Sequence, residues 1–354
     1  MEIETEQLLN LANKRYSEIF KDGFKLFRQT YGTLILPLAL FQLVLIIINI
    51  LLLTDFLVFI NSLAPTYDSI MNKYLGGFTL TEAEWSFLST FLLLDWIYLF
   101  LQNLIGAIII TIAMSSVSSY VYKKYLREDV NFIESFKSSF NKKMFLAVLI
   151  IGFCLPVGSL LLFVPAIFIF GFFIFIVFTF NMESNNNPIS EARAVSKGNF
   201  WKILGVFVLN FIIISFIGSV FEMLFNTLLN TSSPIFIANF NSWYDPASRN
   251  YGMIILYQIL MSFVEILFAP LFICLLTVLF SSLKAKRDLT QGDYFIRKSY
   301  EQIPTQKLDK MENYEPLSKT QLKDKFYCPF CGHFVSTPKK FCPKCGESLD
   351  FLSG

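Results

Sequence analysis

Four cysteines near the end of the chain have the residue type and spacing of metal ligands. Cys328 and Cys331 form one CxxC pair, and Cys342 and Cys345 form a second pair after an interval of ten residues. A CxxC turn directs two thiolates at one ion, and two such turns complete the tetrahedral Cys₄ site of a structural Zn²⁺ ion. The spacing therefore predicts a structural zinc ion held by these four cysteines. Metal binding would supply the folding free energy of so short a segment.

The segment around these cysteines, Tyr327-CPFCGHFVSTPKKFCPKCGESL, closely resembles the short zinc-ribbon modules appended to many prokaryotic proteins. The resemblance covers residues 326–349 and implies a small ribbon with two metal-binding turns. His333 follows the first pair, but four thiolates already fill a tetrahedral site, so we expect this histidine on the ribbon surface. A closed Cys₄ site has no open coordination position, and we expect no catalysis at the zinc ion.

Three carboxylates form a second group of candidate functional residues. Asp95, Glu222 and Glu265 lie inside long apolar runs that contain no Lys or Arg beside them. A carboxylate in hydrocarbon without a cation has to be protonated, hydrated or hydrogen-bonded. Two interpretations stay open: a polar intramembrane site for a cation, a proton or a lipid headgroup, or simple hydrogen bonding between helices. The available amide partners are Gln102, Asn103, Asn210 and Gln258.

The elements that carry these carboxylates are predicted to be membrane-spanning helices. The chain has 354 residues, of which 54% are hydrophobic and 16% are charged. Soluble domains have about 25% charged residues, so this composition excludes a soluble enzyme. A helix needs about 20 apolar residues to cross a bilayer. Runs of at least this length cover residues 34–59, 87–114, 144–180, 203–229 and 253–280.

The run 144–180 is too long for one span, because a single helix of that length would measure about 55 Å. Pro156, Gly158 and Ser159 lie near its middle, and these are turn-forming residues. The sequence therefore predicts two short spans joined by a tight hairpin at 156–159, and six spans in all.

The distribution of positive charge supports this count. With the hairpin, 27 of the 29 Lys and Arg residues fall on one side of the membrane, and Lys73 and Arg249 fall on the other. Positively charged loops are retained in the cytoplasm, so we expect both termini there, in a multi-pass protein of the plasma membrane. The four tail cysteines then lie in a reducing compartment, where CxxC pairs bind metal more often than they form disulfides.

A short amphipathic segment precedes each pair of spans. In the second segment, Phe132, Phe136 and Phe140 recur every four residues and share one helical face. In the third, Asn187-Pro188 has the composition of a helix N-cap and first helical position. Either the membrane domain consists of three repeated units or these segments are ordinary connectors. The predicted organisation is an N-terminal amphipathic helix (1–33), a six-span domain (34–283), a linker (284–325) and the zinc ribbon (326–354).

The six-span layout and the motif EARAVSKGNFWKILGVFVL at 191–209 support a family resemblance. Over about residues 10–285 the chain resembles the membrane domain of some bacterial glycerophosphoryl diester phosphodiesterases and its stand-alone relatives. The catalytic domain of those enzymes needs several histidines and metal-binding carboxylates. This chain has one histidine, His333, so the resemblance implies no hydrolase.

The sequence thus predicts an all-α polytopic membrane protein that is not an enzyme. We expect a scaffold that interacts with lipid, or with a cytoplasmic protein through the zinc ribbon. Nucleic acid is not an expected partner, because the few lysines of the ribbon do not form a basic stripe. The alternative is a transporter or channel for a small solute or ion that uses Glu265, with Asp95 and Glu222 lining its outer half. A weaker third hypothesis is an accessory to a separate lipid-modifying enzyme.

Overall fold

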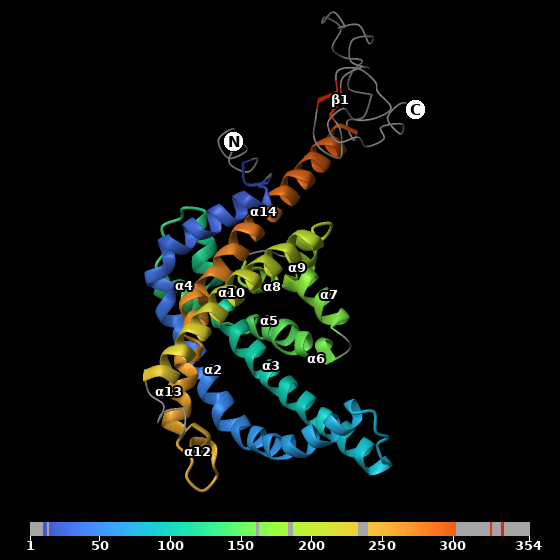
Figure 1. Ribbon diagram of the computed structural model, residues 1–354. Coiled ribbons are helices and arrows are strands. Elements are labelled where there is room, and N and C mark those ends of the chain that lie inside the picture. Colours follow the sequence, from blue (N-terminus) through green and yellow to red (C-terminus); the bar gives the residue numbers. More distant parts are fainter. Residues whose placement is uncertain are drawn as a thin grey trace, which may run out of the picture. The chain divides into compact units, whose positions relative to one another are not determined.

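The computed structural model of the chain describes residues 10–12, 14–160, 163–182, 187–232, 240–301, 326–327 and 334–335. The chain divides into a helical unit, Met1–Gly292, and a tail unit, Asp293–Gly354. In the described part of the helical unit, all regular structure is helical (Figure 1). Four helices are long and apolar enough to cross a membrane, or five if one bent pair is counted as a span. This architecture is that of an all-α membrane protein.

The first two long helices form an antiparallel pair. Helix α2 (Tyr16–Leu75) has 60 residues and measures about 90 Å, which is three times the thickness of the hydrocarbon core. Figure 1 shows that α2 curves along its length; it contains Pro37 and Pro65, residues that bend helices. Because α2 is continuous from Tyr16, the predicted amphipathic segment and the first span are one helix from that residue onward.

Helix α3 (Glu82–Tyr125) runs back along α2 after a short turn at Gly76-Gly77. Aromatic pairs join the two helices near this turn. The ring centroids of Tyr67 and Phe91 lie 4.4 Å apart, and those of Tyr74 and Trp85 lie 5.5 Å apart. The predicted external loop at 60–86 is therefore largely a helical hairpin.

The long apolar run 144–180 also folds as two packed helical arms. The first arm contains α5 (Met144–Ala147), the π-helix η1 (Val148–Cys154) and α6 (Leu155–Leu160). The second contains α7 (Val164–Phe173) and α8 (Ile176–Thr179). Each arm measures about 25 Å, which is less than the roughly 30 Å hydrocarbon thickness.

The predicted position of this turn, at 156–159, is wrong. Those residues lie inside α6, and the chain reverses after it, where Phe163 has a left-handed backbone with φ of 62°. Gly158 serves packing: a Cβ atom there would lie 3.0 Å from the backbone nitrogen of Ala166 on α7. The glycine therefore lets the two arms approach closely.

Two short amphipathic helices confirm local predictions. The side chain of Asn187 caps α9 (Pro188–Ser196), because its Oδ1 accepts a hydrogen bond of 3.1 Å from the backbone N–H of Ile189. The predicted aromatic face of α4 (Phe132–Ser139) is also present. The rings of Phe132 and Phe136 lie 5.6 Å apart, and those of Phe136 and Phe140 lie 5.1 Å apart.

The core of the helical unit surrounds α14 (Phe263–Glu301), which follows α13 (Tyr251–Met261). Eight apolar residues of α14 between Leu271 and Phe280 are at most 1% exposed. The ring of Phe280 contacts those of Tyr122, Phe175 and Phe178 at centroid distances of 5.5, 5.3 and 4.9 Å. Helix α14 continues to Glu301, into the linker that was predicted to begin at residue 284.

The described part of the tail unit includes two short strands. Strand β1 (Phe326–Tyr327) pairs antiparallel with β2 (Phe334–Val335), with Phe326 opposite Val335 and Tyr327 opposite Phe334. The cysteines Cys328 and Cys331 fall between these strands in the sequence and lie outside the described residues.

Enlarging Gly23 should destabilise the helical unit. A Cβ atom at this position of α2 would lie 2.5 Å from Cδ2 and 3.2 Å from Cγ of the buried Leu275 on α14, so the Leu275 side chain leaves no room for a longer side chain here. We expect Gly23→Leu to lower the free energy of unfolding by about 1–3 kcal/mol. Thermal unfolding of the full chain in detergent measures this change. Gly32→Leu on the same helix is the control, because a Cβ atom there meets nothing within 4 Å; equal stability of the two variants would contradict the assignment.

Acid should loosen the turn between α2 and α3. The Lys73 ammonium donates a hydrogen bond of 2.7 Å to the Glu84 carboxylate, and with the backbone N–H of Thr81 it lowers the pKa of Glu84 to about 2. A lowered folded-state pKa means that this stabilisation is complete above the usual pKa of 4.5 and is lost as the pH falls toward 2. Hydrogen exchange of the turn, normalised for intrinsic rates, should increase between about pH 5 and about pH 3. Glu84→Gln should abolish this dependence and Glu82→Gln should preserve it; pH-independent protection in the unaltered chain would refute the prediction.

Candidate functional site

A pocket of about 540 Å³ lies between α2, α3, α10 (Phe200–Ser232) and the α13–α14 segment. Its wall is mostly apolar. The described apolar residues that line it are Leu38, Phe41, Ile109, Ile110, Ala113, Met114, Phe207, Phe211, Ile214, Met261, Val264, Ala269 and Phe272. Pockets of this size and composition accommodate small organic molecules or parts of lipids.

A small set of polar side chains interrupts this apolar wall. They come from α2, α10 and α14 and are Gln42, Asn210, Ser215, Ser219, Glu222 and Glu265. The structure thus brings together two of the three predicted intramembrane carboxylates, Glu222 and Glu265. We call this cavity the acidic pocket.

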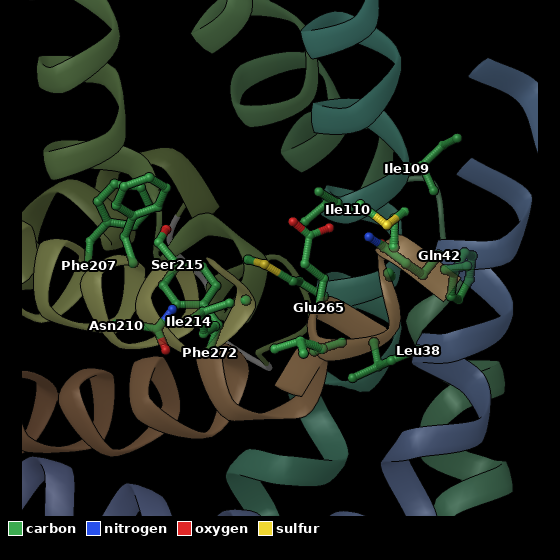
Figure 2. Close-up of a pocket in the computed structure, with 18 of the residues that line it drawn as sticks. Leu38, Gln42, Ile109, Ile110, Phe207, Asn210, Ile214, Ser215, Glu265 and Phe272 are labelled. Atoms are coloured by element: carbon green, nitrogen blue, oxygen red, sulfur yellow. The ribbon is translucent and has the colours of Figure 1, made fainter. Parts of the chain in front are cut away.

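Glu265 owes its position to a local break in the predicted sixth span, residues 253–280. Helix α13 ends at Met261, Ser262 has non-helical angles, and Glu265 lies in the first turn of α14. The side-chain amide of Gln258 lies 3.4 Å from the hydroxyl of Ser262 across this break. Figure 2 shows the Glu265 carboxylate pointing into the space between Gln42 of α2 and Ile110 of α3.

The polar atoms of the acidic pocket are incompletely paired. Neither Glu222 nor Glu265 forms an ion pair with a Lys or Arg of the described side chains. Asn210 is 6% exposed, and its buried Oδ1 atom accepts no hydrogen bond from the described residues. A buried polar atom without a partner costs about 1–3 kcal/mol. The pocket therefore presents carboxylate and amide oxygens that suit a ligand with N–H or O–H donors.

Asp95 is not part of this pocket. It lies on α3 about 21 Å along the helix axis from Ile109, the nearest pocket residue of that helix in sequence. Of the other predicted amide partners, Asn210 and Gln258 lie at or beside the pocket. Gln102 and Asn103 are exposed on α3 and do not line it.

Two polar residues of α2 were missed by the sequence analysis. Gln42 lines the acidic pocket, and Asp55 forms an ion pair of 2.5 Å with Arg249. Both lie inside the apolar run 34–59, and a polar residue in such a run is the sequence feature that could have identified them.

The predicted zinc ligands Cys328, Cys331, Cys342 and Cys345 lie outside the described residues. Within the described part of the chain, no three His, Cys, Asp or Glu side chains gather to hold a metal ion. Two other cysteines are described, and both are free thiols. Cys274 is buried in the core with its sulfur 3.7 Å from Oγ1 of Thr30, and Cys154 is partly buried.

No family model, curated protein or solved structure matches the chain. The resemblance to the membrane domain of glycerophosphoryl diester phosphodiesterases therefore stays a prediction made from the residues.

Proposed function

We propose that this chain is a non-enzymatic membrane protein whose acidic pocket binds an amphiphilic molecule, a lipid with a hydrogen-bond-donating headgroup. The observation that carries the proposal is the apolar pocket of about 540 Å³ whose wall holds two carboxylates without a Lys or Arg partner among the described residues. Acyl chains match the apolar wall. An amine or hydroxyl headgroup supplies the donors that Glu222 and Glu265 lack among the described residues.

A primary ammonium headgroup fits best. It carries three N–H donors and one positive charge, which the carboxylates of the acidic pocket complement. A choline headgroup carries the same charge but no N–H donor. Phosphatidylethanolamine and phosphatidylcholine therefore form a matched pair of ligands that separates hydrogen bonding from charge.

The proposed topology has six spans with both termini in the cytoplasm of a plasma-membrane protein. The short arms of 144–180 support it, because their connection brings the chain back to the side from which it entered. The beginnings of α2 and α10 and the end of α3 also meet. The Lys14 ammonium lies 2.6 Å from the Tyr125 hydroxyl, and Lys202 donates to the Lys14 carbonyl at 2.7 Å. These ends carry the excess of Lys and Arg, which favours a cytoplasmic location.

The proposed tail is a zinc ribbon that binds a cytoplasmic protein. The antiparallel pairing of β1 with β2 supports it, because the two strands flank the first CxxC pair in the sequence. The four cysteines would hold Zn²⁺ as a structural ion.

A transporter for a small solute or ion is the second candidate. The break at Ser262 favours it, since an interrupted helix beside an intramembrane carboxylate is a common feature of transporter binding sites. In this function Glu265 would bind the transported cation or proton.

Loss of the Glu265 charge should weaken retention of phosphatidylethanolamine. Native mass spectrometry of the full chain, released from nanodiscs, measures bound lipid; we expect Glu265→Gln to reduce phosphatidylethanolamine by about tenfold and phosphatidylcholine much less. Gly218→Leu, which adds a side chain to open space in the pocket wall, should exclude both lipids. The controls are Asp95→Asn and Gly106→Leu, since neither residue lines the pocket and Gly106 is equally unobstructed.

Unchanged lipid retention in both Glu265→Gln and Gly218→Leu would refute lipid binding in this pocket. Cation or proton flux into liposomes that disappears in Glu265→Gln, with lipid retention unchanged, would instead establish the transporter.

The tail should bind one zinc ion per chain. Ser at any of Cys328, Cys331, Cys342 or Cys345 removes one of four thiolate ligands, so we expect loss of zinc from the purified protein by elemental analysis. Cys154→Ser and Cys274→Ser are the matched controls and should retain the metal. Full zinc content after substitution of both cysteines of one CxxC pair would overturn the Cys₄ assignment.

A further inference from the structure

A second pocket, of about 340 Å³, lies where α3, α8, α9 and α14 meet. It is lined by Ser119, Tyr122, Lys123, Phe178, Asn181, Met182, Glu191 and Lys284. It shares no lining residue with the acidic pocket, so what it binds is independent of the function proposed above.

The acidic group of this second pocket is already neutralised. The Glu191 carboxylate forms an ion pair of 2.7 Å with Arg287 of α14, and both side chains are largely buried. The two lysines of the pocket are not neutralised in this way. Neither Lys123 nor Lys284 forms an ion pair with a carboxylate among the described residues. The pocket therefore carries an excess of positive charge.

The neutral polar groups of the pocket are donors as well. Lys284 lies 3.4 Å from the Tyr122 hydroxyl, and an ammonium group can only donate, so the hydroxyl proton of Tyr122 stays available. Asn181 accepts a hydrogen bond of 3.1 Å from Asn141 through Oδ1, which leaves its amide N–H groups to donate. The Ser119 hydroxyl has no hydrogen-bond partner in the described part of the chain.

We propose that this second pocket is a phosphate-binding site. Two ammonium groups, two hydroxyls and one amide line it from three segments of the chain, and its one carboxylate is paired with Arg287. A phosphate group provides several strong acceptor oxygens and one or two negative charges, which this set complements. Basic pockets between the ends of membrane helices bind the headgroups of anionic lipids. The same chemistry serves a lipid phosphomonoester or free inorganic phosphate.

The test compares three probes on the full chain by native mass spectrometry: dioleoylphosphatidic acid, dioleoylglycerol and inorganic phosphate. Dioleoylglycerol has the same acyl chains without the phosphate. We expect phosphatidic acid to bind and dioleoylglycerol not to bind at this site. Lys123→Gln and Lys284→Gln should each reduce phosphatidic acid occupancy by about tenfold.

Matched controls are Lys124→Gln and Lys286→Gln, whose side chains are exposed neighbours that do not line the pocket. If Lys284→Gln fails to fold, the variant Lys123→Gln still tests phosphate binding, because Lys123 is exposed. Competition experiments on the unaltered chain test it as well. Displacement of phosphatidic acid by inorganic phosphate supports a site for phosphate from either source. Lipid binding without displacement supports a site specific for lipid-borne phosphate. Equal occupancy by dioleoylglycerol, or unchanged binding in both lysine variants, would overturn the proposal.

Discussion

The middle of α14 is enclosed by protein on all sides, and the helical unit is organised around it. Lipid tails are as apolar as leucine, so a membrane helix gains little from burial alone and depends on close packing and dispersion. The structure meets this demand with small residues and aromatic rings: Gly23 admits Leu275, and Phe280 contacts the rings of Phe175 and Phe178. Both pockets are built on this helix, since α14 places Glu265 in one and Lys284 in the other. Their geometry therefore depends on the fit of α14 in the core.

The two pockets have opposite hydrogen-bonding surpluses. One offers oxygen atoms from carboxylates and an amide, whereas the other offers ammonium, hydroxyl and amide donors. In the second pocket, Arg287 pairs with Glu191 and so removes the one negative charge from the wall. The acidic pocket has no corresponding cation among its lining residues. The acidic pocket thus lacks hydrogen-bond donors, whereas the second pocket lacks negatively charged acceptors. The two pockets therefore suit ligands of different chemistry.

Much of the membrane architecture followed from composition and periodicity, because long apolar runs and the Asn187 cap act locally. The lateral arrangement did not, since it depends on how helices rotate against one another. Glu222 and Glu265 share a pocket while Asp95 does not, although all three interrupt apolar runs. Gln42 was missed because a single amide in an apolar run does not indicate whether its side chain lines a pocket. The turn was misplaced at 156–159 because glycine serves helix packing as well as turns.

The turn at Gly76-Gly77 has a consequence for how the chain tolerates cleavage. From Tyr16 to Tyr125, a stretch the structure describes completely, the backbone is helical except at 76–81. Proteases need an extended backbone, and a helix must first unfold locally to supply one. This turn is accordingly the point within the stretch that is open to cutting, and inserted sequences are best accepted at such exposed tips. A chain cut there would remain assembled, because the rings of Tyr67 and Phe91, and of Tyr74 and Trp85, hold the two helices together on either side of the missing bond.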